Sequence, residues 1–342
     1  PLVFGNNDRP GVMLASAVST YINRYAVVPG SQTVVFTNND GAYRTVLDLL
    51  DAGISVTTVV DIRSNSFGDL PRQVRERGIE VCAGQAVVDV QGQKSVKGVN
   101  IMQLDGDGSM VTGKPRSLDC NLLAVSGGWN PTVHLHSQSG GGVRYNKKSA
   151  CFIPTKSVQQ ERSAGACNGT FSLSKCISEG MTVGASAAAA AGFGDGLPSS
   201  TIVSVNDPSE EPIVPMWLVP SPWKIGHGPK QFVDPQTDTS AADISIAARE
   251  GYQSVEHVKR YTTLGMGSDQ GKVGNVNGIG ILAQVLDTDV DSVGTTTFRP
   301  AYTPVAFGAI AGRNLQKFFD PVRKTSIHRW HEEANARFED VG

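Results

Sequence analysis

The residues best suited to nucleotide chemistry lie in the turn Thr37 to Tyr43, which reads T-N-N-D-G-A-Y between a β-branched run and a helical pattern. A dinucleotide-binding fingerprint at such a turn is G-x-G-x-x-G, whose second glycine lets backbone amides approach the pyrophosphate. Here Thr37 and Asn39 replace the first two glycines, although Asp61 follows at the spacing of a ribose-binding acid. The turn is therefore either a NAD site or the remnant of one. The side chain of Asn39 and the charge of Asp40 favour the remnant.

Two other turns carry the bare backbone that the first turn lacks. An apolar run from Asn121 to Val125 leads into a Ser-Gly-Gly-Trp turn, and the sequence Gly165 to Gly169 precedes a long alanine-rich stretch. Glycine lets backbone come close to a bound cofactor, so two glycine turns feeding one sheet are typical of a flavoprotein-like cofactor domain. Plain tight turns are the alternative. The candidate cofactor-binding residues of these turns are Ser126, Gly127, Gly128, Trp129, Gly165, Ala166 and Gly169.

Two further loops, Arg260 to Lys272 and Gly294 to Pro300, combine hydroxyl groups and glycines with cations. Free amides, hydroxyls and positive charge are what a phosphate-binding loop needs. The first loop is not a Walker loop, because Gln270 stands where a glycine is required and a valine follows Lys272. The alternatives are a flexible loop with incidental charges and a helix cap with a buried arginine. The candidates here are Arg260, Thr262, Thr263, Lys272, Thr296 and Arg299.

No set of side chains has the spacing of a catalytic triad or of a metal site. Two histidine pairs are close in sequence, His134 with His136 and His328 with His331, and the second pair favours a polar helix face over a site. The five cysteines include no C-x-x-C pair, which argues against structural zinc and favours a reducing cytoplasm over a disulfide framework. We therefore predict neither catalytic residues nor metal ligands in this chain.

The elements that must position these turns alternate between strands and helices. A strand, turn, helix and second strand ending in an acid form the skeleton of a nucleotide-binding βαβ unit, which predicts the α/β class. The expected strands are 33–37, 55–61, a small meander over 80–104, and 118–125. The expected helices are 12–25, 43–52, 72–77, a long one within 163–192, and patterns over 234–262 and 303–319.

Bulk composition limits the classes of partner. The 342 residues are enough for two domains and carry a net charge of −2. Near-neutral charge argues against a nucleic-acid partner, and no apolar run reaches the roughly 20 residues of a membrane-spanning helix. The sequence starts without Met and enters patterned sequence at once, so we expect a piece of a longer protein without a signal peptide.

Several longer motifs resemble the alpha subunit of heterotetrameric sarcosine oxidase, and the likeness spans essentially the whole chain. The motifs are Asn7–Ala15, Thr37–Asp40, Ser126–Pro131, His257–Thr263, Gly271–Lys272, Asn275–Gly278 and Gly294–Pro300. The resemblance implies oxidation of sarcosine to glycine by oxygen, with hydrogen peroxide as product. The one-carbon unit would pass to tetrahydrofolate or leave as formaldehyde.

The resemblance also implies cofactors and partners. In that family the beta subunit holds FAD, FMN lies at the alpha–beta boundary attached to beta, and the alpha subunit carries NAD. This chain would lack the upstream glycine fingerprint and the C-terminal folate domain, and alone it would not be catalytic. Its partners would be the beta, gamma and delta subunits. The alternatives are an independent NAD-dependent dehydrogenase and a subunit of a related amine or opine oxidase.

The fold implied by the resemblance is a FAD/NAD(P)-binding, nested Rossmann-like pair of domains followed by a mixed, mainly helical linker domain. Residues 1–30 and 119–205 would form the returning half of the first dinucleotide domain, and residues 31–118 would form the inserted second domain. Residues 206–233 would be a proline-rich linker. Residues 234–342 would form a helical and loop domain at the flavin-subunit interface. The altered turn at Thr37 belongs to the insert. We therefore expect NAD against the first domain, at Gly127, Gly128 and the Gly165 to Gly169 turn, and FMN near the loops 260–272 and 295–299.

Overall fold

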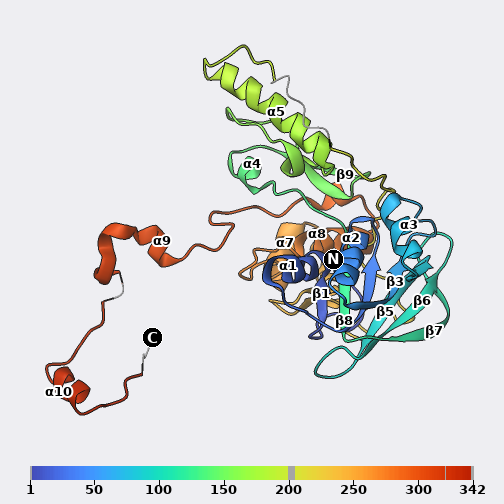
Figure 1. The fold of residues 1–342 in the computed structure, drawn as a ribbon, viewed down its shortest axis with the longest axis horizontal. Coiled ribbons are helices and arrows are strands. Elements are labelled where there is room, and N and C mark those ends of the chain that lie inside the picture. The colour runs from blue at the N-terminus through green and yellow to red at the C-terminus, as the bar shows by residue number, and fades with distance from the viewer. Residues whose placement is uncertain (1, 199–204, 320, 340–342) are drawn as a thin grey trace. The chain divides into compact units, whose positions relative to one another are not determined.

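The computed structural model describes residues 2–198, 205–319 and 321–339. The chain divides into one unit from Pro1 to Tyr302 and a second unit from Thr303 to Gly342 (Figure 1). The first unit contains every residue predicted to bind a cofactor.

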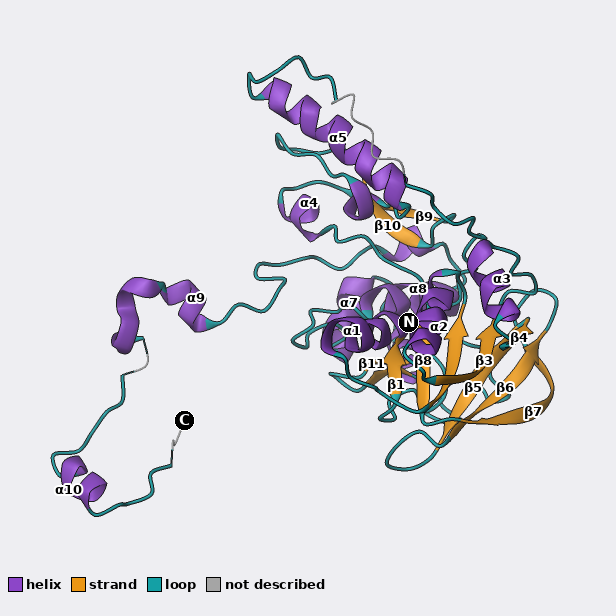
Figure 2. Ribbon diagram, in the orientation of Figure 1, coloured by secondary structure: helices purple, strands orange, loops and turns teal. Residues whose placement is uncertain are grey.

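A five-stranded parallel sheet forms the centre of the first unit (Figure 2). Its spatial order is β1 (Val12–Leu14), β8 (Leu122–Ser126), β2 (Gln32–Thr37), β3 (Ser55–Asp61) and β4 (Glu80–Ala83). The strands are rich in β-branched residues because both faces of a parallel sheet are covered. The register places Thr37 beside both Ser126 and Asp61, so three strands end together. Open α/β sheets bind nucleotides at this edge, and the first two candidate turns lie there.

Alternate side chains of the sheet build two separate cores, because successive strand residues point to opposite faces. Val35 and Val59 pack against helices on one face, whereas Val34 and Val60 pack against a meander on the other. The helices are α1 (Ala15–Tyr25), α2 (Gly41–Asp51) and α3 (Asp69–Glu76). The antiparallel meander consists of β5 (Gln85–Gln91), β6 (Gly98–Leu104) and β7 (Val111–Asp119).

A helical layer with its own core follows in sequence. It comprises β11 (Phe232–Asp234), β12 (Thr239–Ser240), α6 (Ala241–Arg249), α7 (Val255–Thr262), α8 (Asn275–Val285) and η2 (Val290–Val293). A capping box starts α6, because Ser240 Oγ accepts the Asp243 N–H while the Asp243 carboxylate accepts the Ser240 N–H. Leu264 and Leu282 belong to this core together with Tyr145 from the preceding segment.

That preceding segment holds the candidate turn Gly165 to Gly169. Its elements are α4 (His134–Gln138), β9 (Val143–Asn146), β10 (Cys151–Pro154), η1 (Gly165–Asn168) and α5 (Leu173–Ala190). None of the residues of α5 is buried. The long alanine-rich helix is thus confirmed, but it begins only after the Gly165–Gly169 turn.

The sheet contains strands from both expected dinucleotide domains, the one formed by residues 1–30 and 119–205 and the one formed by residues 31–118. β8 pairs with β1 and also with β2, so one sheet runs across the boundaries expected at residues 30 and 118. The strand expected over 118–125 is two strands, since the chain turns at Asn121, whose side-chain oxygen accepts the Ser31 and Gln32 N–H groups at 3.0 and 2.9 Å. Of the expected part 119–205, residues 199–204 lie outside the described residues.

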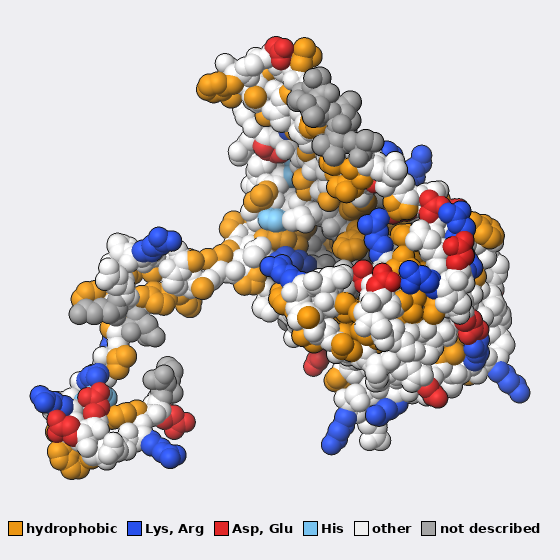
Figure 3. Space-filling model, viewed as in Figure 1, with side chains coloured by type: hydrophobic (Ala, Val, Ile, Leu, Met, Phe, Trp, Pro, Cys, Tyr) orange, Lys and Arg blue, Asp and Glu red, His pale blue; other side chains and the backbone are white. Residues whose placement is uncertain are grey.

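The second unit begins at Thr303, inside the domain expected over 234–342. It contains α9 (Phe307–Ala311), η3 (Arg313–Phe318) and α10 (His328–Glu333), so the helix expected over 303–319 is interrupted, at Gly312 with φ +82°. In its described residues no side chain is buried, and Figure 3 shows hydrophobic side chains on the surface of this unit. Phe307, for example, is 82% exposed. Across the described ranges, no helix combines the length and the apolar character that a membrane crossing requires.

Candidate functional site

A buried charge network closes the carboxyl ends of β2 and β3. The Arg63 guanidinium lies 2.7 Å from Asp40 Oδ1 and 2.7 Å from Asp61 Oδ2, and its Nε donates to Asp61 Oδ1 at 3.0 Å. All three side chains are at most 3% exposed. Tyr43 Oη also donates to Asp61, and burial followed by the charge of Asp61 raises the pKa of Tyr43 above its usual value. The carboxylate expected to hold a ribose is thus fully engaged within the protein.

The turn before α2 is filled by its own side chains. Asn39 Oδ1 accepts the Gly41 N–H at 3.0 Å, and Asn39 Nδ2 donates to Ser126 Oγ at 2.9 Å. The N-terminal amide of a helix is the group that would otherwise bind a phosphate. The structure therefore supports the interpretation of this turn as a remnant.

A segment from the predicted linker covers the same turn. Asn38 Nδ2 donates to the Val214 carbonyl at 2.8 Å, and the Glu211 N–H donates to Asp40 Oδ2 at 2.8 Å. Ile213 packs on Gly128, where the Cδ1 atom lies 2.4 Å from the position a Cβ would take. Because Gly128 has no side chain, Ile213 can pack directly against it, and the turn can adopt φ +98° there.

One cavity of about 630 Å³ lies between the Gly128 turn and the start of α5. Gly128 and Trp129 line one part, and residues that follow the Gly165–Gly169 turn line another. Trp129 is 54% exposed. The other lining residues include Asn39, Asp40 and Gly41 of the α2 turn and the charged residues Arg44, Lys175, Asp207, Glu210 and Glu211. The structure therefore brings Gly128 and Trp129 together with the start of α5, whereas Gly165, Ala166 and Gly169 do not line the cavity.

The N-terminus of α5 already holds an anion, the carboxylate of Asp207. Asp207 Oδ1 accepts the Leu173 N–H at 3.0 Å, and Oδ2 accepts the Ser172 hydroxyl at 2.7 Å and a hydrogen bond from the Ser174 hydroxyl. The hydrogen bonds from Ser174 and Ser172 lower the pKa of Asp207. This end of the helix therefore has the donors that a phosphate oxygen would use.

The turn before α5 is held by a carboxylate as well. Glu179 accepts the Gly165 N–H at 2.9 Å and the Asn168 side-chain amide at 2.6 Å. Ile153 packs on Gly169, with Cγ2 at 2.6 Å from the position of a Cβ. These contacts position the N-terminus of α5 rather than exposing the turn to a ligand.

The glycines of the 260–272 loop enclose a side chain, Asn275. A Cβ at Gly265 would lie 2.1 Å from Asn275 Oδ1, and one at Gly271 would lie 2.1 Å from Asn275 Nδ2. Asn275 Nδ2 donates to Thr296 Oγ1 at 3.2 Å, which joins this loop to the 294–300 loop. The glycines thus make room for the Asn275 amide. The backbone of the predicted phosphate-binding loop is therefore covered by this side chain.

Lys272 and Thr296 nevertheless lie close to groups that the sequence did not single out. Lys272 Nζ lies 4.8 Å from the centroid of the Tyr302 ring, and the His134 ring stacks on the same tyrosine at 4.4 Å. Burial followed by the charge of Lys272 lowers the pKa of His134. Lys272, Thr296 and Tyr302 line one small cavity with Asn275 and Asn130. The residues around Lys272 gave no signal that His134 would lie beside it, because His134 is distant in sequence.

The remaining candidates are less closely grouped. Thr262 and Thr263 end α7, where the Thr262 hydroxyl donates to the Val258 carbonyl at 2.8 Å and Thr263 has φ +61°. Arg260 lies 3.7 Å from Glu256, which also accepts the Thr297 N–H at 2.5 Å. Arg299 is exposed and not buried as a helix cap would require. Glu256 thus links Arg260 to the 294–300 loop, while Lys272 and Thr296 share the small cavity.

The sheet, its helices and the meander define the class of protein as an α/β protein with a fold of the FAD/NAD(P)-binding type. An L-proline dehydrogenase from P. horikoshii has a similar fold, with a TM-score of 0.59 and 18% sequence identity over 91% of this chain and 56% of that one.

The sequence comparisons are more specific. Residues 228–313 match the sarcosine oxidase A3 domain. The chain is 42% identical over 349 aligned residues to the sarcosine oxidase subunit alpha of Corynebacterium sp. strain P-1, and 39% identical over 346 to that of Rhizobium meliloti. Both alignments cover 100% of this chain but only 35% and 33% of the relatives. Along its whole length the chain is a homologue of sarcosine oxidase alpha subunits, of which it spans about a third.

Proposed function

We propose that this chain is the nucleotide-binding and flavin-framing part of a sarcosine oxidase alpha subunit. The observation that carries the proposal is the contrast at the sheet edge. Asn39 already uses the free amide of the α2 turn, and Arg63 pairs the carboxylates beside it, whereas the cavity that this turn borders also reaches Gly128, Trp129 and the α5 N-terminus. The whole enzyme would oxidise sarcosine to glycine with oxygen and tetrahydrofolate. Its products would be hydrogen peroxide and methylenetetrahydrofolate or formaldehyde.

The cavity beside Gly128 is the site we propose for NAD. Its volume of about 630 Å³ lies in the usual range for ligand pockets. The amides and hydroxyls that now hold Asp207 would serve a pyrophosphate oxygen, and Lys175 and Arg44 would supply positive charge against the carboxyl groups of Glu210 and Glu211, which line the same cavity. Trp129 would offer a half-exposed ring for stacking. Asp207 has to leave the helix end for this to happen, because both anions use the same donors.

The side of the helical layer around Lys272 is the surface we propose for FMN. Lys272 and Arg299 have no carboxylate partner among the described residues, and the Thr296 hydroxyl lies in the same small cavity as Lys272. Unpaired cations beside hydroxyl groups suit a phosphate or the electron-rich edge of a flavin ring. Bound there, FMN would supply electron transfer. This chain would supply charge and hydrogen bonds, while the beta subunit would hold FAD and gamma and delta would complete the assembly.

An independent NAD-dependent dehydrogenase is the second candidate function. It would need a dinucleotide on the α2 turn with the ribose on Asp61, and the Arg63 network occupies both positions. A subunit of a related amine oxidase remains compatible with the fold shared with L-proline dehydrogenase. The identity of the amine would then be set by another subunit.

Replacing Lys272 or Arg299 with alanine in the complete multi-subunit enzyme should weaken FMN retention or slow electron transfer to FMN by about tenfold. This is the loss of one charge-assisted contact. The measurements are flavin content, the FMN absorption spectrum and the rate of FMN reduction. Lys114→Ala, at an exposed position of β7, is the matched control and should change none of them. Unchanged flavin content and rate in both test variants would count against the proposed surface.

A further inference from the structure

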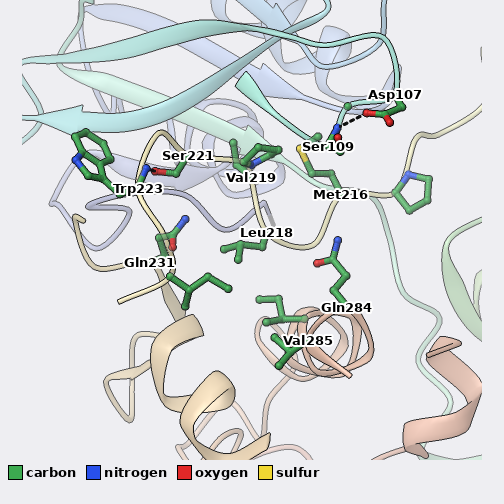
Figure 4. A pocket seen from close by; sticks show the side chains of 15 residues that line it. Asp107, Ser109, Met216, Leu218, Val219, Ser221, Trp223, Gln231, Gln284 and Val285 are labelled. Atoms are coloured by element: carbon green, nitrogen blue, oxygen red, sulfur yellow. Dashed lines mark hydrogen bonds between the residues drawn. The ribbon is translucent and has the colours of Figure 1, made fainter. Parts of the chain in front are cut away.

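A second cavity lies where two hydrophobic cores of the first unit meet (Figure 4). Met216 and Val219 belong with the core between the sheet and the meander, whereas Leu218, Ile281 and Val285 belong with the core of the helical layer. All five line the cavity, whose volume is about 500 Å³. Junctions between packed layers are common places for small-molecule sites. This cavity shares no lining residue with the cavity beside Gly128.

The walls of this cavity combine apolar side chains with uncharged polar ones. They come from the meander turn at Asp107 to Ser109, from the segment 215–231 and from α8. Trp223 closes one end, where its ring packs on Gly228 while the residue remains 47% exposed. An exposed indole face is a stacking surface for aromatic rings, worth about 1–3 kcal/mol for a nucleobase.

Two glutamine amides supply the polar contacts. The side chains of Gln231 and Gln284 lie on opposite sides of Leu218 in the view of Figure 4, and neither amide has a hydrogen-bond partner among the described residues. A primary amide presents a donor and an acceptor side by side. It therefore matches a ring edge on which an N–H lies next to a carbonyl or ring nitrogen.

The charges around the cavity exclude anions. None of the described residues that line it is Lys, Arg or His, and the one charged side chain is Asp107, which accepts the Ser109 N–H at 2.9 Å. A phosphate or carboxylate would find no counter-charge there and would be repelled by Asp107.

We propose that this cavity binds an uncharged planar heterocycle of nucleobase to flavin-ring size, held between Gln231 and Gln284 and stacked toward Trp223. The site is separate from the anion-binding surfaces proposed for NAD and FMN, and it does not depend on either. The cavity should bind the heterocyclic ring alone more tightly than the same ring carrying a phosphate. The bound molecule would join the two cores, because it touches residues of both.

Lumichrome, an uncharged three-ring heterocycle, is the probe for this site. Titrated into the full chain and followed by its fluorescence, it should bind saturably at one site. Gln284→Leu should weaken binding about fivefold to tenfold, since one hydrogen-bonding amide is lost at an exposed position that does not support the core. Gln73→Leu, an equally exposed glutamine on α3, is the matched control and should leave binding unchanged.

Two further measurements separate this site from the others. Val285→Trp should fill the cavity and abolish binding, with circular dichroism confirming that the variant is folded. FMN, which adds a phosphate to a similar ring, should bind this site at least tenfold more weakly than lumichrome. Absence of saturable lumichrome binding would overturn the proposal. So would equal affinity in the Gln284→Leu variant, or preference for FMN over lumichrome.

Discussion

Replacing Arg63 with alanine should lower the free energy of unfolding by about 3–5 kcal/mol, the largest effect we expect from any single substitution in this chain. The guanidinium is the only described partner that pairs both Asp40 and Asp61, and these carboxylates are 1% and 0% exposed. Without Arg63, two buried negative charges would face each other. Burying an unpaired charge costs several kcal/mol, or forces the carboxylate to take up a proton.

Urea denaturation followed by circular dichroism measures this loss. Arg72→Ala is the matched control, because Arg72 also pairs with an aspartate, Asp69, but its side chain is 62% exposed. That substitution should cost less than about 1 kcal/mol, as expected of a surface ion pair. Adding Asp40→Asn and Asp61→Asn to Arg63→Ala should restore part of the loss, since the unpaired charges are removed. A loss below about 1 kcal/mol in Arg63→Ala would show that the network does not hold the sheet edge together.

Replacing Gly271 with alanine should cost about 2–4 kcal/mol of stability and disturb the surface around Lys272. The new methyl group would lie 2.1 to 2.2 Å from the atoms of the Asn275 amide, and the backbone there has φ +73°. Strained backbone alone costs about 1 kcal/mol, and overpacking of a buried amide adds about 1–3 kcal/mol. Asn275 also donates a hydrogen bond to Thr296, so the 260–272 loop and the 294–300 loop should no longer be held together.

Gly53→Ala separates the two causes. Gly53 has the same φ as Gly271, +73°, but nothing lies within 4 Å of the position of its Cβ. This variant should therefore cost only about 1 kcal/mol. Thermal unfolding of both variants is the measurement. Equal losses at Gly271 and Gly53 would contradict the role assigned to the contact with Asn275.

The strands and helices around the sheet edge could be predicted because their signals are local. β-branched runs at Thr33 and Ser55 mark buried strands, and Asn39 in place of glycine already indicated a closed turn. The role of Arg63 could not be predicted in this way. It lies two residues beyond Asp61, yet one of its partners, Asp40, comes from a different strand end, so only the paired sheet brings them together.

Glycine patterns were the weakest guide to the site. A glycine indicates that something approaches the backbone closely, but it does not identify that group. At Gly128 the group is Ile213, at Gly169 it is Ile153, and at Gly271 it is Asn275. In each case a side chain of the protein takes the space expected for a cofactor, whether it comes from far along the sequence, as Ile213 does, or from four residues away, as Asn275 does. Segment 206–233 was interpreted as a linker, but its residues Glu211, Ile213 and Val214 cover the α2 turn and the adjoining Gly128.

A cryo-electron-microscopy map of the complete multi-subunit enzyme purified with NAD tests the central claim most directly. The account predicts dinucleotide density in the cavity beside Gly128 and Trp129, with its pyrophosphate at the N-terminus of α5 and Asp207 moved from the Leu173 N–H. It also predicts that the bonds from Arg63 to Asp61 remain intact. Density for NAD on Asn38 and Asp61, with the cavity beside Gly128 empty, would contradict it.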